Sequence, residues 1–227
     1  LCFVAFGPMY VAQYRLLPRR WSAIPVGVAF AAYCFALFLN ATSVMSMGPI
    51  LGIAAAAGVI GLIIGAFLRP FAERTGYRWF VVALPLIWVT IDLLTRNNEI
   101  VGTYSWIAYR LADAPQLVQP VSIVSTPALS LLIHVVNAAV ALVVLALIDR
   151  SRTLAVEHPV PDRVLAWSVA VPAAVALVWG GSSVALYREV SEQMGPEVRV
   201  AAVQPGLDNA TPGTLISAGN VTPGRSE

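Results

Sequence analysis

The chain has 227 residues, of which 58% are hydrophobic and 11% are charged, and its mean hydropathy is +0.76. In soluble globular domains about a quarter of the residues are charged, so this composition excludes that class. It also excludes disordered, collagen-like, coiled-coil and disulfide-rich secreted chains. The formal net charge is only +2 and no basic cluster exceeds three residues, which excludes a nucleic-acid-binding surface.

Charged residues are absent from five stretches, at 1–14, 21–68, 79–91, 114–148 and 164–187. Because a helix needs about 20 apolar residues to cross about 30 Å of hydrocarbon, the sequence predicts an all-α polytopic membrane bundle of about six transmembrane helices. We expect these spans near residues 1–14, 23–43, 49–68, 79–95, 120–148 and 164–187.

The stretch from 21 to 68 is too long for one helix, since it would reach about 70 Å as a single helix. Turn-forming residues between Asn40 and Pro49 predict the break within it. The span after the break contains four consecutive alanines and several glycines. These small residues predict a close approach to a neighbouring helix: Gly52, Gly58, Gly61 and Gly65.

The connecting segments differ sharply in basic residues. Those after the first, third and fifth spans hold nine arginines, whereas those after the second and fourth hold only Arg96 and Arg110. Because cytoplasmic loops carry the excess of positive charge, we expect the odd-numbered loops to be cytoplasmic. The loop at 96–119 and all residues after 187 are then predicted to be extracytoplasmic.

The character of the chain changes after the sixth span. Residues 188–197 have the composition of a polar linker, and Val198–Gln204 is a β-branched run typical of a buried parallel strand. One strand cannot bury itself, so we expect 198–227 to be the truncated start of an α/β domain. The chain also opens directly into apolar sequence without an initiator Met, which is typical of a fragment.

Two sets of residues together resemble the apolipoprotein N-acyltransferase family. The first combines a Trp, an acidic residue and an Arg at the end of one span with an aromatic loop, a Gln and a later Asn: Trp88, Asp92, Arg96, Trp106, Tyr109, Gln119 and Asn137. The second is Val198–Gln204 followed by Pro205, which is similar to the opening strand of the family's nitrilase-like carbon–nitrogen hydrolase domain.

The resemblance implies transfer of an acyl chain from a phospholipid to the amino-terminal Cys of a lipoprotein, at the bacterial inner membrane and without a cofactor or metal. In the family, a Glu–Lys–Cys triad performs this reaction. This sequence contains no Lys, and its two cysteines, Cys2 and Cys34, lie in apolar stretches, where we expect small buried residues. No triad position can be assigned, so we expect this chain alone to be catalytically inert.

The resemblance makes Asp92, Arg96, Trp106 and Tyr109 the candidate substrate-entrance residues. In this interpretation Asp92 organises the outer mouth and pairs with Arg96 one helical turn away. Alternatively, Asp92 is an interfacial residue that reaches water, and the aromatic residues form an interfacial belt. Ser130, His134 and Asn137 share one helix face, which fits interhelical hydrogen bonds or a polar relay. For the whole protein, a membrane-anchored nitrilase-type amidase and a small transporter or channel component remain alternative hypotheses.

Overall fold

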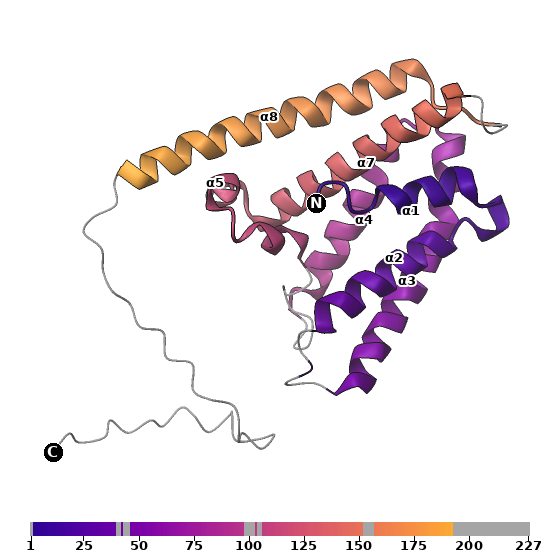
Figure 1. Cartoon of the computed structure of the whole chain (residues 1–227), viewed down its shortest axis with the longest axis horizontal. Helices are drawn as coiled ribbons and strands as arrows, with labels where there is room; N and C mark the ends of the chain where they lie inside the picture. The colour runs from indigo at the N-terminus through magenta and orange to yellow at the C-terminus, as the bar shows by residue number, and fades with distance from the viewer. Residues whose placement is uncertain are drawn as a thin grey trace. The chain divides into compact units, whose positions relative to one another are not determined.

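The computed structural model describes residues 2–39, 42, 46–97, 103, 106–151 and 157–192, which belong to one compact unit (Figure 1). Within these residues, every regular element is a helix. In chain order they are α1 (Gly7–Val11), the π-helix η1 (Ala12–Leu16), the 3-10 helix η2 (Arg19–Trp21), α2 (Ile24–Phe38), α3 (Met47–Arg74), α4 (Phe80–Thr95), the 3-10 helix η4 (Ile107–Leu111), α5 (Pro115–Val118), α6 (Val121–Val124), α7 (Thr126–Ser151) and α8 (Asp162–Glu192).

Four helical stretches are long and apolar enough to cross a membrane: Arg19–Phe38, Met47–Arg74, Thr126–Ser151 and Asp162–Glu192. Four of the about six expected spans therefore coincide with helices that have the length and apolar composition of a membrane span. The helix α4 falls where the fourth span was expected, but its 16 residues rise only about 24 Å. In the first expected span, α1 and η1 have five residues each, which together cover about half of the hydrocarbon thickness.

Several predicted boundaries were wrong, because loss of hydropathy marks the edge of a membrane and not the end of a helix. The break between α2 and α3 is confirmed, but α2 ends at Phe38, and α3 continues past the predicted end at residue 68 to Arg74. Arg69 and Glu73 pair one helical turn apart and support this extension. Likewise, α8 begins at Asp162 and continues to Glu192, so residues 188–192 of the expected linker are helical.

The expected span at 120–148 begins too early. Its apolar start forms the short helix α6, and a sharp turn at Ser125, with φ 77° and ψ 161°, separates α6 from α7. Hydropathy could not reveal this turn, since Val121, Ile123 and Val124 are as apolar as the helix that follows. The rest of the expected linker, the expected strand Val198–Gln204 and the whole segment 198–227 lie outside the described residues.

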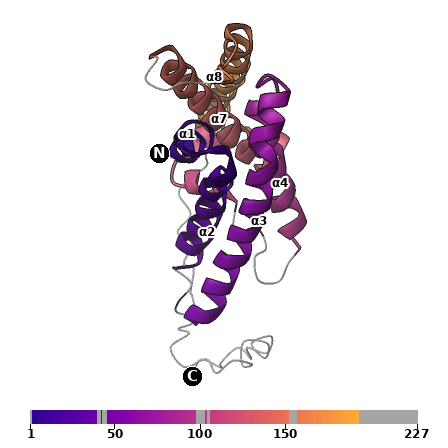
Figure 2. The same ribbon diagram turned by 90° about the vertical axis from the view of Figure 1, so that its right-hand side faces the viewer.

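Helices α2 and α3 lie side by side through their small residues (Figures 1 and 2). A Cβ atom added to Gly61 would lie 2.8 Å from the carbonyl oxygen of Val26, and one added to Gly65 would lie 2.9 Å from that of Ala23. The predicted close approach is thus confirmed at Gly58, Gly61 and Gly65. It was wrong for Gly52, which has nothing within 4 Å of an added Cβ.

The exposed face of α3 carries most of its large apolar side chains, whereas five of its seven buried residues are Gly or Ala; the other two are Ile50 and Leu68. Phe67 is 71% exposed and Ile63 is 57% exposed, while Gly58 and Ala54 are buried. A helix on the surface of a water-soluble protein usually buries its large apolar side chains, so this arrangement is the reverse. It suits a helix whose outer face contacts lipid tails. The pattern and the four long apolar helices together are compatible with a membrane protein.

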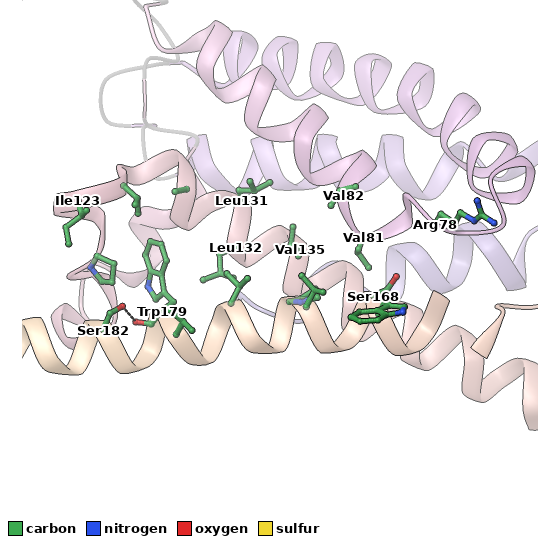
Figure 3. Close-up of a pocket in the computed structure, with 18 residues that line it drawn as sticks. Arg78, Val81, Val82, Ile123, Leu131, Leu132, Val135, Ser168, Trp179 and Ser182 are labelled. Carbon is green, nitrogen blue, oxygen red and sulfur yellow. Dashed lines mark hydrogen bonds between the residues drawn. The ribbon is translucent and has the colours of Figure 1, made fainter. Parts of the chain in front are cut away.

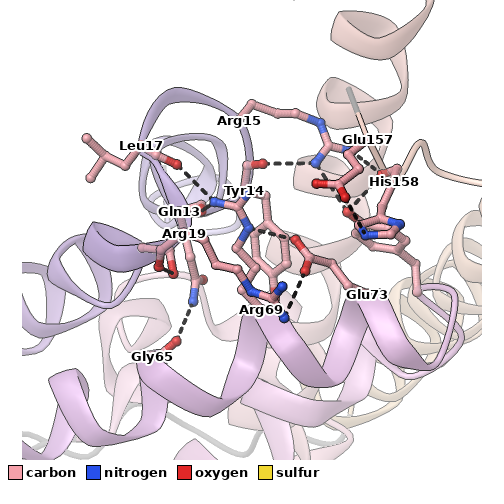
Figure 4. A network of polar contacts seen from close by, with 12 residues as sticks. Gln13, Tyr14, Arg15, Leu17, Arg19, Gly65, Arg69, Glu73, Glu157 and His158 are labelled. Carbon is pink, nitrogen blue, oxygen red and sulfur yellow. Dashed lines mark hydrogen bonds and ion pairs between the residues drawn. The ribbon is translucent and has the colours of Figure 1, made fainter. Parts of the chain in front are cut away.

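Polar contacts join the N-terminal segment, the α3–α4 turn and the α7–α8 connection at one end of the bundle, here called the basic end (Figure 4). The guanidinium of Arg15 donates to both carboxylate oxygens of Asp149, at 2.6 and 2.9 Å, and to the hydroxyl of Tyr77. The Tyr77 hydroxyl in turn donates to the carbonyl of His158, and Arg69 donates to the carbonyls of Gln13 and Leu17. The loops after the first, third and fifth expected spans therefore meet at one end of the bundle.

Arg15 is almost inaccessible, with 4% of its side chain exposed, and so is its partner Asp149, at 6%. Burial lowers the pKa of Arg15, but its hydrogen bonds to Asp149 and Tyr77 outweigh this effect and hold the pKa above its ordinary value. Arg15 consequently stays charged, and its contact with Asp149 ties helix α7 to the N-terminal segment.

Candidate functional site

The opposite end of the bundle, here called the Asp92 end, holds the residues that the family resemblance selects. Asp92 lies in the last turn of α4 and is only 4% exposed. The indole Nε1 of Trp106 donates to the backbone carbonyl of Asp92 at 3.2 Å, and the Thr95 hydroxyl donates to the same carbonyl. The carbonyl lacks a helical partner near the end of α4, so these contacts satisfy it, and the contact from Trp106 holds this residue against the helix.

Tyr109 completes this arrangement. Its ring stacks on Trp106, with centroids 6.1 Å apart and planes 13° apart, and its hydroxyl donates to Thr103 Oγ1. Trp106 is buried, whereas Tyr109 is about half exposed. The structure therefore brings Asp92, Trp106 and Tyr109 into one cluster.

Arg96 follows α4 as its C-cap residue and is exposed, whereas Asp92, one helical turn earlier, is buried. The pairing of Asp92 with Arg96 stays a prediction.

A cavity of about 270 Å³ adjoins Asp92 between α2, α3 and α4. Its walls are mostly apolar, and Asp92, Cys34 and Tyr33 supply polar groups. Sequence reasoning did not identify Tyr33 or Cys34 as site residues, because nothing in their local pattern indicates that α2 meets the end of α4. Cys34 and Cys2 are both free thiols, and both are half-buried.

The polar face predicted on α7 is buried, and its members behave differently. The side-chain amide of Asn137 accepts a hydrogen bond from the Phe6 amide at 3.0 Å and donates to the Cys2 carbonyl at 2.7 Å. This supports the interhelical interpretation for Asn137, which anchors the N-terminal segment. The ring of His134 packs against Trp88, with centroids 4.8 Å apart, and lies in an apolar environment.

The arrangement at the Asp92 end can bind a ligand. The cavity offers an apolar volume beside a buried carboxylate, which suits an apolar chain with a polar group at its end. Among the described residues, no three His, Cys, Asp or Glu side chains come close enough together to hold a metal ion.

Comparisons with known proteins do not assign this site. No family model, curated protein or solved structure matches the chain. The function must therefore be argued from the residues and their arrangement.

Proposed function

We propose that this chain is the membrane domain of an apolipoprotein N-acyltransferase-like protein, located in a bacterial inner membrane. In this proposal, the Asp92 end lies at the extracytoplasmic surface and receives phospholipid and lipoprotein substrates. The residues after 187 lead outward to a nitrilase-like catalytic domain. The chain by itself holds substrate and performs no acyl transfer.

The observation that carries the proposal is the cluster of Asp92, Trp106 and Tyr109 beside an apolar cavity. The order of these residues in the sequence resembles the family's motif, with Asp92 where Glu is usual, and the indole of Trp106 donates to the carbonyl of Asp92. The cavity beside Asp92 has the apolar walls that an acyl chain requires, and Trp106 and Tyr109 suit the interface where a lipid headgroup lies.

The charge distribution supports the proposed orientation. The arginine-rich loops meet at the basic end, whereas the Asp92 end holds few basic residues. By the positive-inside rule, this distribution favours a cytoplasmic basic end. In a variant without Cys2 and Cys34, a single cysteine at Ala112 should react with a membrane-impermeant thiol reagent in intact cells. A cysteine at Ser151 should be protected, and the opposite labelling pattern would overturn the orientation.

Substrate binding can be tested with a phospholipid that carries a diazirine at the end of one acyl chain. After irradiation in nanodiscs, we expect crosslinks on α2 and α3 where they line the cavity, and we expect a diacylated lipopeptide to compete. Ala56→Phe should reduce crosslinking because Ala56 lines the cavity. Ala55→Phe is the matched control, since Ala55 is also exposed on α3 but does not line the cavity.

Two results would contradict the proposal. One is crosslinking that spreads evenly over the helices and does not respond to the lipopeptide. The other is a hydroxylamine-labile acyl adduct on Cys2 or Cys34, because the proposal assigns acyl transfer to a domain outside these residues. Such an adduct would show that the membrane helices carry the nucleophile themselves.

A further inference from the structure

A second apolar groove runs between α8 on one side and α4, α6 and α7 on the other (Figure 3). Its volume is about 700 Å³, which lies in the range of small-molecule binding sites. Arg78 and Ser168 lie at one end of the groove, and Ile123, Trp179 and Ser182 lie at the other. Arg78 lies just before the start of α4, at the basic end of the bundle. This groove is therefore distinct from the cavity beside Asp92, which lies at the other end of α4.

The groove exists because α8 packs loosely on the bundle. Among the 31 residues of α8, only Ser168, Pro172 and Ser183 are buried. Several apolar side chains that line the groove are also exposed, among them Val175 at 50% and Val178 at 72%. The groove is therefore open along its side, and its apolar walls are unsuited to hold water.

One end of the groove is polar and positively charged. Arg78 is exposed at this end, and no carboxylate in the described part of the chain forms an ion pair with it. Nearby, Pro172 has no N–H group to donate, so the helical hydrogen bond to the carbonyl of Ser168 is missing. Both Ser168 and Pro172 line the groove. The polar end thus offers a cation and a hydroxyl beside a long apolar channel.

We propose that this groove binds one glycerophospholipid, with the phosphate at Arg78 and an acyl chain lying along α8. Charge complementarity favours this occupant, because a guanidinium binds a phosphate with charge-assisted hydrogen bonds. A second copy of this chain would place apolar side chains in the groove but would leave Arg78 without an anion.

The length of the groove agrees with a lipid of one leaflet. The lining residues of α8 extend from Trp167 to Ser182, which corresponds to about 22 Å along a helix. One leaflet accounts for half of a hydrocarbon core that is about 30 Å thick. An acyl chain that starts near Arg78 therefore fits within the groove.

This site differs from the proposed substrate site in position and leaflet. Arg78 precedes α4 and Asp92 lies in its last turn, so the two are separated by about 20 Å along the helix. The lipid at Arg78 would lie in the leaflet of the basic end. The inference does not depend on the acyltransferase proposal, since it uses neither the Asp92 cluster nor the orientation of the chain.

Native mass spectrometry of the purified 227-residue protein tests the proposal. The protein in detergent micelles is titrated with dioleoyl phosphatidylglycerol or with dioleoylglycerol, which has the same chains but no phosphate. It is then released from the micelles inside the spectrometer. We expect one phosphatidylglycerol per monomer, bound about tenfold more tightly than dioleoylglycerol. This comparison uses the unaltered chain, so it does not depend on the folding of a variant.

Matched variants then locate the site. Arg78→Gln should weaken phosphatidylglycerol binding about tenfold, whereas Arg74→Gln should leave it unchanged, because Arg74 is exposed at the end of α3 but does not line the groove. Val175→Trp should also weaken binding by filling the groove. Leu177→Trp is its control, since Leu177 is 77% exposed on α8 and does not line the groove.

Three results would overturn the proposal. Equal affinity for the two lipids would show that the phosphate is not recognised. An Arg78→Gln variant that binds phosphatidylglycerol as tightly as Arg74→Gln would show that the headgroup lies elsewhere. A protein dimer that Val175→Trp disrupts, without a bound phospholipid, would show that a second copy of the chain fills the groove.

Discussion

The close packing of α2 on α3 gives the sharpest test of the fold, through the paired variants Gly61→Ala and Gly52→Ala. Both replace glycine with alanine on the same helix, so both gain the same helix propensity of about 1 kcal/mol. They differ in what the added Cβ meets. At Gly61 it would lie 2.8 Å from the Val26 carbonyl oxygen and 2.9 Å from the Cα of Gly27, whereas at Gly52 it meets nothing within 4 Å.

The difference between the two variants isolates the cost of separating the helices. Ordinary Cβ contacts begin near 3.4 Å, so the backbone of α2 must move by about half an ångström to admit the new methyl group. Overpacking of a tight interface costs about 1–3 kcal/mol. Because the propensity gain cancels in the comparison, Gly61→Ala should be less stable than Gly52→Ala by this amount.

Unfolding in mixed micelles with an increasing fraction of sodium dodecyl sulfate, followed by circular dichroism, measures this difference. Gly65→Ala provides an independent repeat, since its added Cβ would lie 2.9 Å from the Ala23 carbonyl oxygen. If Gly61→Ala and Gly65→Ala unfold at the same detergent fraction as Gly52→Ala, the α2–α3 interface is not as close as described and the reasoning fails.

Three further predictions use the same unfolding measurement. Asp149→Asn should destabilise the protein by about 3–5 kcal/mol, because it leaves the buried guanidinium of Arg15 without its counter-charge. As a control, Asp162→Asn should have no measurable effect, because Asp162 belongs to an exposed ion pair. Ser125→Gly should stabilise the protein by about 1–3 kcal/mol, since only glycine adopts φ 77° and ψ 161° without strain. An unchanged unfolding midpoint would contradict the strained turn. Asn137→Ala should lower the free energy of unfolding by about 1–3 kcal/mol and expose residues 2–16 to proteases, because it removes the hydrogen bonds to Phe6 and Cys2. Ser130→Ala should have neither effect, since the Ser130 hydroxyl has no partner among the described residues.

The candidate site was predictable in part. The family resemblance selected Asp92, Trp106 and Tyr109 from their order in the sequence, and these three residues do lie together. The pairing of Asp92 with Arg96, which the spacing of one helical turn suggested, stays a prediction. The cavity walls at Tyr33 and Cys34 come from another helix and had no local signal.

The sequence by itself determined the class of the protein and the positions of most long helices. Hydropathy is a sum over neighbouring residues, so it located the apolar cores of α2, α3, α7 and α8 and the break between α2 and α3. The count of arginines also grouped the loops at 15–20, 69–78 and 150–163 correctly. These properties depend on each segment's own composition and on the thickness of the bilayer.

Only the tertiary structure decided which distant groups meet. Arg15 and Asp149 are 134 residues apart, yet their ion pair closes the basic end. The turn at Ser125 interrupts an apolar run that hydropathy reads as continuous, and the groove beside Arg78 depends on how loosely α8 packs on α7. Each of these features arises from contacts between segments, and a one-dimensional pattern of apolar and charged residues carries no information about which segments become partners.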